Sequence, residues 1–168
     1  VVLDALQKCL RPSLPDELGQ GRDYLCRPSR PYARLHLAAA WRVENPALME
    51  RYLSEKRKMR ADLEADGLQS EVPELWKQVW TRENGGVAAL PEASELDAGL
   101  NETFLFHGTR PVTIPKIMHS GLNERVNQRG FFGAGTYLAE CAGKADQYTG
   151  LDARWQPEGA ELHDLHRL

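Results

Sequence analysis

The short stretch Leu105-Phe-His-Gly-Thr109 is the part of the sequence from which both the fold and the site are predicted. It closes an apolar, aromatic-rich run that begins at Thr103 and predicts a short strand. A glycine at a strand end lets the backbone approach a ligand closely, because glycine has no Cβ atom. The N–H and C=O of Gly108 suit a carboxamide, and the side chains of His107 and Thr109 can bond to hydroxyl groups.

A second stretch, Phe132-Gly-Ala-Gly-Thr-Tyr-Leu-Ala-Glu140, follows a polar loop. Gly133 and Gly135 flank an alanine just before Tyr137, which predicts a tight turn that presents an aromatic ring. Tyr148 lies eleven residues further on. Two such rings can bracket a flat heterocycle, and stacking adds about 0.5–1.5 kcal/mol beyond the burial of the rings.

A dinucleotide-binding glycine loop is the first alternative for these glycines. That motif needs a third glycine, and Leu138 stands in its place. It also needs a strand–helix unit with an acidic residue about twenty positions further on, which the sequence does not offer. We therefore reject this reading of the two glycines.

Composition excludes several classes of function. The 168 residues carry 21 Lys plus Arg and 24 Asp plus Glu, and the net charge of −3 argues against a general nucleic-acid binder. The longest apolar run, Leu37 to Trp41, is far shorter than the ~20 residues of a membrane-spanning helix. Three cysteines at unrelated spacings predict an intracellular protein, cytoplasmic or nuclear. The chain begins with Val1, so we expect a fragment whose targeting signals can lie elsewhere.

No metal site is expected. His163 and His166 lie three residues apart on a possible helix, but no fourth ligand is spaced to join them and Cys141. Cys141 has no evident base beside it, which favours a small packing residue over a nucleophile.

Regular structure is also predicted before these stretches. The alternation of apolar and polar residues from Tyr32 to Ala38 predicts a half-buried strand, with His36 on its polar side. Asn45 and Pro46 predict the start of a helix that ends at about Gly67. The apolar face of this helix is expected to consist of Leu48, Tyr52, Met59 and Leu63. Its solvated face is expected to consist of Glu55, Lys56, Arg57, Lys58 and Arg60.

Further helices are predicted over 70–81, 111–120 and 141–148. Trp76 and Trp80 share an apolar stripe on the first of these helices, and Gly121 ends the second. Residues 85–100 predict a linker or loop. Near the start of the chain, one helical face is expected from Leu3, Leu6 and Leu10.

Three motifs in this order and spacing resemble the catalytic core of the poly(ADP-ribose) polymerase (PARP) family, which is related in fold to diphtheria toxin: Leu105–Thr109, Phe132–Glu140 and Lys144-Ala-Asp-Gln-Tyr148. Residues 34–60 are similar to the first strand and helix of that family, and to its mono-ADP-ribosylating branch above all. The resemblance covers 32–64 and 101–150. It implies an N-terminal extension over 1–30 and a catalytic domain over 31–168, with an inserted helix and loop at about 68–100.

The resemblance implies an α+β fold, in which a split antiparallel β-sheet with flanking helices holds NAD⁺ in a cleft. It implies an enzyme, an ADP-ribosyltransferase (a glycosyltransferase) that cleaves the nicotinamide–ribose bond of NAD⁺ and transfers ADP-ribose to an acceptor. NAD⁺ is then a substrate, and no metal is required. The acceptor is expected to be a protein; a nucleic-acid acceptor is an alternative without support in the residues, and no membrane partner is expected.

Roles follow from the resemblance position by position. His107 would bond to the ribose hydroxyls, the Gly108 backbone would hold the carboxamide, and Thr109 would lie near the adenosine. Tyr137 and Tyr148 would sandwich the nicotinamide. His107 and Tyr137 are therefore the catalytic candidates, and the candidates for NAD⁺ binding are His107, Gly108, Thr109, Tyr137, Lys144, Ala145 and Tyr148.

Two departures from the family pattern bear on activity. Ala145 stands where many members carry a serine, which removes a hydrogen bond worth about 0.5–1.5 kcal/mol. The third catalytic position lies on a later strand, and we expect the last strands of the fold to follow Leu168. The alternatives are therefore a catalytically inactive PARP-like module that binds NAD⁺ or a partner protein, and an RNA 2′-phosphotransferase, which the Gly135–Glu140 stretch fits poorly.

Overall fold

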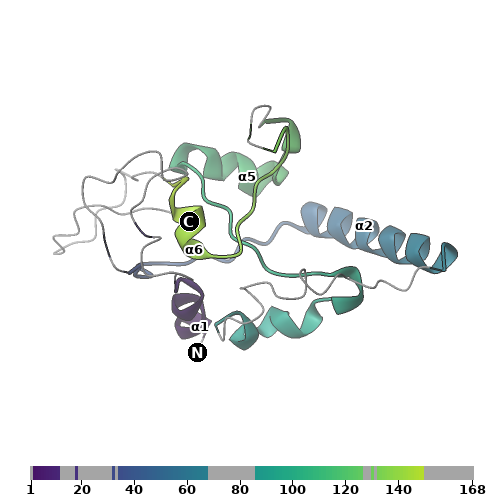
Figure 1. The fold of residues 1–168 in the computed structure, drawn as a ribbon, viewed down its shortest axis with the longest axis horizontal. Coiled ribbons are helices and arrows are strands. Elements are labelled where there is room, and N and C mark those ends of the chain that lie inside the picture. The colour runs from purple at the N-terminus through teal and green to yellow at the C-terminus, as the bar shows by residue number, and fades with distance from the viewer. Residues whose placement is uncertain are drawn as a thin grey trace.

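The computed structural model describes residues 2–11, 18, 32, 34–67, 86–126, 130 and 132–149. In these ranges, helices are joined by extended segments (Figure 1): α1 (Val2–Cys9), α2 (Pro46–Ala65), α5 (Ile114–Ser120) and α6 (Ala142–Asp146). Short 3₁₀ helices lie among them, namely η2 (Val87–Ala89), η3 (Pro91–Glu95), η4 (Ala98–Leu100), η5 (Pro111–Thr113) and η6 (Glu124–Val126). The β-pairing of the described ranges consists of two isolated bridges, Phe106–Ala139 and Gly130–Gly133.

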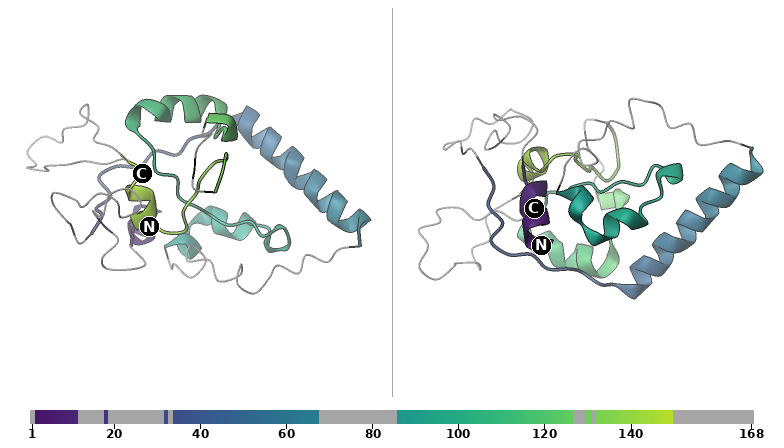
Figure 2. Two further views of the ribbon diagram at one scale, coloured as in Figure 1. Left: turned by 45° about the horizontal axis from the view of Figure 1, so that its top comes forward. Right: turned by 90° about the horizontal axis from the view of Figure 1, so that it is seen from below.

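Figure 2 shows that α2 extends away from α1 and α6, which lie close together. The helices predicted over 46–67, 111–120 and 141–148 are confirmed, the second as η5 followed by α5. The loop predicted over 85–100 contains η2, η3 and η4. The helix predicted over 70–81, with both tryptophans, lies outside the described residues, as do His163 and His166.

Helix α1 packs against the chain at η2 through its small residues. Ala5 and Cys9 are buried, and a Cβ atom on Gly86 would collide with the backbone of both. The predicted helix is thus confirmed; of the leucines expected on one face, Leu6 and Leu10 are half-buried and Leu3 is 62% exposed. Close approach of the η2 backbone needs short side chains, so the contact with η2 falls on Ala5 and Cys9.

The segment over 34–40 is extended, and its exposure alternates as the sequence predicts: Arg34 and His36 are exposed, Leu35 and Leu37 half-buried. The side chain of Gln7 on α1 bonds to the backbone of this segment, as a neighbouring strand would. Its Nε2 donates to the Leu35 carbonyl at 3.0 Å, and its Oε1 accepts from the Leu37 N–H at 2.7 Å. Two backbone groups of a half-buried chain are thereby satisfied by one side chain.

Asn45 joins α2 to α5. Its Oδ1 accepts from the Leu48 N–H at 3.2 Å and caps the start of α2, with Pro46 in the first turn as predicted. Its Nδ2 donates to the Met118 and His119 carbonyls at 3.0 and 3.2 Å, where α5 ends. Gly121 then leaves α5 with a φ of 78°, a conformation that favours glycine. One side chain therefore satisfies backbone groups at the ends of two helices.

The two faces predicted for α2 are confirmed in part. Helix α2 buries none of its residues, and of the predicted apolar face Leu48 and Leu63 are half-buried, whereas Tyr52 and Met59 are 49% and 52% exposed. Of the predicted solvated face, only Lys56 is half-buried, and it forms an ion pair with Glu102 at 2.7 Å. The acidic stretch that ends at Glu102 lies beside this part of the helix, so the contact there falls on cationic residues.

We predict that Asn45→Ala lowers the free energy of unfolding by about 1–2 kcal/mol, because the α2 cap and both bonds to α5 are lost together. Denaturant unfolding followed by circular dichroism measures this change. Asn45→Ser is the matched control, since its hydroxyl can still cap α2 while both bonds to α5 are lost, and its stability should lie between those of the wild type and Asn45→Ala. An unchanged midpoint for Asn45→Ala would contradict the joint role of this residue.

Candidate functional site

A single antiparallel bridge brings the two sequence motifs side by side. The Phe106 N–H donates to the Ala139 carbonyl at 2.7 Å, and the Ala139 N–H donates to the Phe106 carbonyl at 2.8 Å. The bridge lies one residue before His107 and two residues after Tyr137. Residues thirty positions apart in the sequence are therefore neighbours in space.

His107 contacts the second motif directly. Its Nδ1 lies 3.0 Å from the carbonyl oxygen of Tyr137. A carbonyl can only accept, so this bond requires the proton on Nδ1 and leaves Nε2 of the neutral ring as an acceptor. The half-buried His107 ring is thus held in one orientation and offers its second nitrogen to a hydroxyl donor. Thr109, two residues further on, is half-buried as well.

Gly108 lies directly against helix α6. A Cβ atom at this position would overlap the carbonyl oxygen and carbon of Ala145, which is itself 2% exposed. The sequence predicts a close approach of the Gly108 backbone to a ligand, and the described structure has a close approach to the backbone of α6. The absence of a side chain at Gly108 therefore allows the first motif to pack onto the helix that carries Lys144 and Ala145.

We predict that Gly108→Ala destabilises the protein by about 1–3 kcal/mol, because backbone atoms of α6 must move to admit the methyl group. Gly135→Ala is the matched control, since a Cβ atom there meets nothing within 4 Å. Thermal unfolding of both variants measures the difference. Equal stability of the two variants would contradict the packing of Gly108 on α6.

The phenol of Tyr137 holds the turn that precedes it. Its hydroxyl accepts from the Phe132 N–H at 2.9 Å and donates to the Gly133 carbonyl at 2.8 Å. A Cβ atom on Gly130 would collide with the phenol, so this glycine makes room for the ring. The rings of Phe132 and Tyr137 are stacked, with centroids 6.3 Å apart. The predicted turn that presents an aromatic ring is confirmed, with Phe132 itself 92% exposed beside it.

Lys144 and Tyr148 are neighbours at the end of α6. The Lys144 Nζ lies 5.4 Å from the centre of the Tyr148 ring, a cation–π contact, and donates to Gln147 Oε1 at 3.1 Å. Both side chains are half-buried. The sandwich of a heterocycle between Tyr137 and Tyr148 stays a prediction.

Asp146 and Tyr32 form a contact that sequence reasoning missed. Asp146 is 5% exposed and accepts a hydrogen bond from the Tyr32 hydroxyl, 114 residues away, while Thr149 caps its carbonyl at 2.7 Å. The only sequence signal is a carboxylate inside a run of small residues. A buried carboxylate needs partners, and this one joins α6 to the start of the extended segment.

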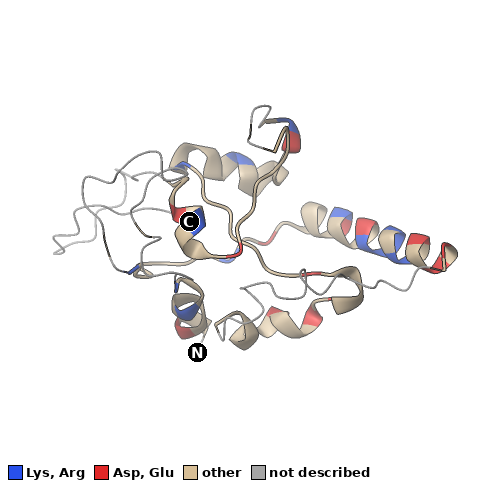
Figure 3. Ribbon diagram, in the orientation of Figure 1, with Lys and Arg blue, Asp and Glu red and all other residues tan. Residues whose placement is uncertain are grey.

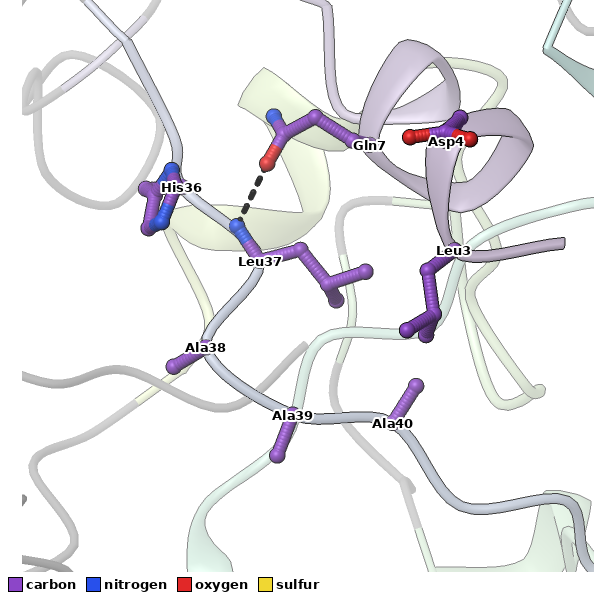
Figure 4. Close-up of a pocket in the computed structure, with 8 residues that line it drawn as sticks. All are labelled: Leu3, Asp4, Gln7, His36, Leu37, Ala38, Ala39 and Ala40. Atoms are coloured by element: carbon purple, nitrogen blue, oxygen red, sulfur yellow. Dashed lines mark hydrogen bonds between the residues drawn. The ribbon is translucent and has the colours of Figure 1, made fainter. Parts of the chain in front are cut away.

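A cavity of about 460 Å³ lies apart from these motifs (Figure 4). It lies between α1 and the segment over 34–40, and it is lined by Leu3, Asp4, Gln7, His36, Leu37, Ala38, Ala39 and Ala40. Figure 4 shows the amide oxygen of Gln7 turned toward the Leu37 N–H. The cavity contains none of the predicted site residues, and it offers mainly apolar walls.

Other kinds of site find little support in the part of the chain that the structure describes. No group of three or more His, Cys, Asp or Glu there can hold a metal ion, and no helix there is long and apolar enough to cross a membrane. Cys9 and Cys141 are both buried free thiols. Burial raises the pKa of the Cys9 thiol, which lowers its nucleophilicity at neutral pH.

Comparison with protein families agrees with the motif geometry. The family model of the poly(ADP-ribose) polymerase catalytic domain matches residues 20–156, which is more than half of the chain. The chain belongs to the PARP family. PARP catalytic domains are ADP-ribosyltransferases that use NAD⁺ as substrate. Among curated proteins, no match was found.

In a PARP domain, the bridged motifs are the expected place for NAD⁺. The match includes Leu105–Thr109, Phe132–Glu140 and Lys144–Tyr148, so all three motifs belong to the family domain. It begins at residue 20, whereas the boundary predicted from the sequence is at 31. That boundary and the inserted region at about 68–100 stay predictions.

Proposed function

We propose that this chain cleaves the nicotinamide–ribose bond of NAD⁺ and transfers ADP-ribose to a protein acceptor. The observation that carries the proposal is the Phe106–Ala139 bridge, which aligns His107 with Tyr137 and seats Gly108 on α6. We propose for it an α+β fold with a split antiparallel sheet, consistent with this bridge and with the alternating exposure over 34–40. The buried free thiols support a reducing compartment, cytoplasmic or nuclear.

Each residue has a role in this proposal. The acceptor Nε2 of His107 takes a ribose hydroxyl, while its Nδ1 stays on the Tyr137 carbonyl. The backbone N–H and C=O of Gly108 hold the carboxamide, and Thr109 lies toward the adenosine. Tyr137 and Tyr148 stack on the nicotinamide, with Lys144 and Ala145 beside them. These groups orient NAD⁺ and stabilise the positive charge that develops on the ribose.

A second candidate function is an inactive module that binds NAD⁺ or a partner protein. The observation that favours it is Ala145, which supplies no hydroxyl where many family members have a serine. Such a module would keep the bridge and the Gly108 contact, because both concern packing, and would bind without turnover. Activity, and not shape, therefore separates the two candidates.

We predict that His107→Ala and Tyr137→Ala each lower NAD⁺ turnover by orders of magnitude, because a positioning contact and a stacking ring are lost. Nicotinamide release and transfer of labelled ADP-ribose measure this, in this chain and in a form that continues past Leu168. Tyr137→Phe is the control, since it keeps the ring and removes only the hydroxyl bonds of the turn. Normal turnover in both alanine variants would overturn the site, and no turnover in either folded wild-type form would favour the binding module.

We also predict that Ala145→Ser tightens the binding of nicotinamide-like inhibitors several-fold, which corresponds to one added hydrogen bond of about 1 kcal/mol. Isothermal titration calorimetry measures the dissociation constant. Ala142→Ser is the matched control, because Ala142 is equally buried on α6 and has no predicted contact with the ligand. Equal affinities in the three proteins would mean that the carboxamide lies elsewhere.

A further inference from the structure

The carboxylate of Glu102 connects α2 to the segment that leads to His107. It accepts hydrogen bonds from the Tyr52 hydroxyl, from Lys56 Nζ at 2.7 Å and from the Asp97 N–H. The side chain of Glu102 is only 13% exposed and that of Lys56 only 18% exposed. We call Tyr52, Lys56, Arg60, Asp97 and Glu102 the Glu102 cluster.

The loop over 97–102 is closed on itself within this cluster. The Asp97 carbonyl accepts from the Leu100 and Glu102 N–H groups at 3.1 and 3.0 Å, and the Asp97 carboxylate accepts from the Gly99 N–H at 2.9 Å. The Asp97 carboxylate also forms an ion pair with Arg60 of α2. Backbone and side-chain bonds therefore fix both ends of one short loop.

Helix α2 presents a single polar row to this loop. Tyr52, Lys56 and Arg60 follow one another at intervals of four, so they lie along one face of the helix. Figure 3 shows charged residues of both signs along α2, among which Lys56 and Arg60 have acidic partners on the loop. The helix thus serves as a rigid support for the loop, although it buries none of its own residues.

The pKa values of Glu102 and Tyr52 are both shifted away from the physiological pH range. Burial would raise the pKa of Glu102, but hydrogen bonds from Lys56, Tyr52 and the Asp97 N–H outweigh it and lower that pKa below its ordinary value of 4.5. Its stabilising contribution is therefore present above pH 4.5 and is lost as the pH falls through the lower folded value. Burial and Glu102 raise the pKa of Tyr52 to about 12, so its contribution is present below pH 10 and is lost toward pH 12.

The position of the cluster in the chain gives it a consequence for the site. Glu102 lies five residues before His107, a distance of roughly 17 Å at most for an extended chain. The far end of this short segment is held by the two hydrogen bonds of the Phe106–Ala139 bridge. The bridge and the His107–Tyr137 contact hold the far end of this segment, and the Glu102 cluster holds its near end on α2.

We propose that Glu102 is a positioning residue for NAD⁺ cleavage. Through its bonds to Tyr52 and Lys56 it holds the start of the segment that leads to His107 against α2. This inference rests on the proposed function, because it concerns the geometry of the same site. Glu102 touches no reacting atom in this account. Its loss lets the segment shift, and small displacements of a positioning group lower the rate more than they lower substrate affinity.

The test compares Glu102→Gln with Glu102→Asp, which keeps the charge, and with Glu95→Gln, which removes an exposed carboxylate of η3. We expect Glu102→Gln to lower kcat for nicotinamide release about 10- to 100-fold with little change in KM. Glu102→Asp should recover part of kcat, and Glu95→Gln should match the wild type. Lys56→Met combined with Glu102→Gln should be no worse than Glu102→Gln alone, since both remove the same contact.

A second measurement does not depend on activity. The Phe106 amide hydrogen is bonded across the bridge, so its exchange with solvent reports how well the segment is held. We expect faster exchange at Phe106 in Glu102→Gln than in Glu95→Gln. Unchanged kcat or unchanged exchange in Glu102→Gln would overturn the inference. Absence of nicotinamide release from the wild type, together with faster exchange in Glu102→Gln, would overturn the proposed function and leave the contact itself intact.

Discussion

The antiparallel bridge between Phe106 and Ala139 is the constraint on which the rest of the site depends. Two backbone hydrogen bonds of 2.7 and 2.8 Å join segments that lie about thirty residues apart. Once they are formed, His107 reaches the Tyr137 carbonyl and Gly108 meets the backbone of Ala145. A site assembled from three motifs therefore depends on one pairing and on the lack of a side chain at one glycine.

Among the described residues, polar side chains connect the elements that surround the bridge. Gln7 substitutes for a strand along the extended segment, and Asn45 bonds to the ends of two helices. Asp146 fastens α6 to Tyr32, and Glu102 fastens the His107 segment to α2. Each of these is a half-buried or buried polar group with its partners in place, which is the condition under which such groups stabilise a fold.

Local signals were sufficient for the described α-helices but not for their contacts. Asn45 and Pro46 begin α2, Gly121 ends α5 at a positive φ, and exposure alternates from Arg34 to Ala38, all of which the sequence predicts. These features depend on neighbouring residues, so a short window of sequence contains the information. The three motifs likewise predicted the residues that the bridge brings together.

Contacts between distant residues were not predictable in the same way. Lys56 and Glu102 are 46 residues apart and Tyr32 and Asp146 are 114 apart, and neither spacing has a local pattern. A run of charges on a helix predicts a solvated face, and only the tertiary position of the 97–102 loop makes Lys56 a half-buried partner. The contact of α1 with Gly86 was missed for the same reason, since the close approach of the two backbones selects small residues.

The proposed function requires that the bridged motifs bind the nicotinamide end of NAD⁺. A crystal structure with a non-hydrolysable NAD⁺ analogue tests it most directly. We expect the nicotinamide between Tyr137 and Tyr148, its carboxamide on the backbone of Gly108, and a ribose hydroxyl on Nε2 of His107. An analogue bound in the cavity beside Gln7 and Leu37, with the motif residues unoccupied, would contradict the claim.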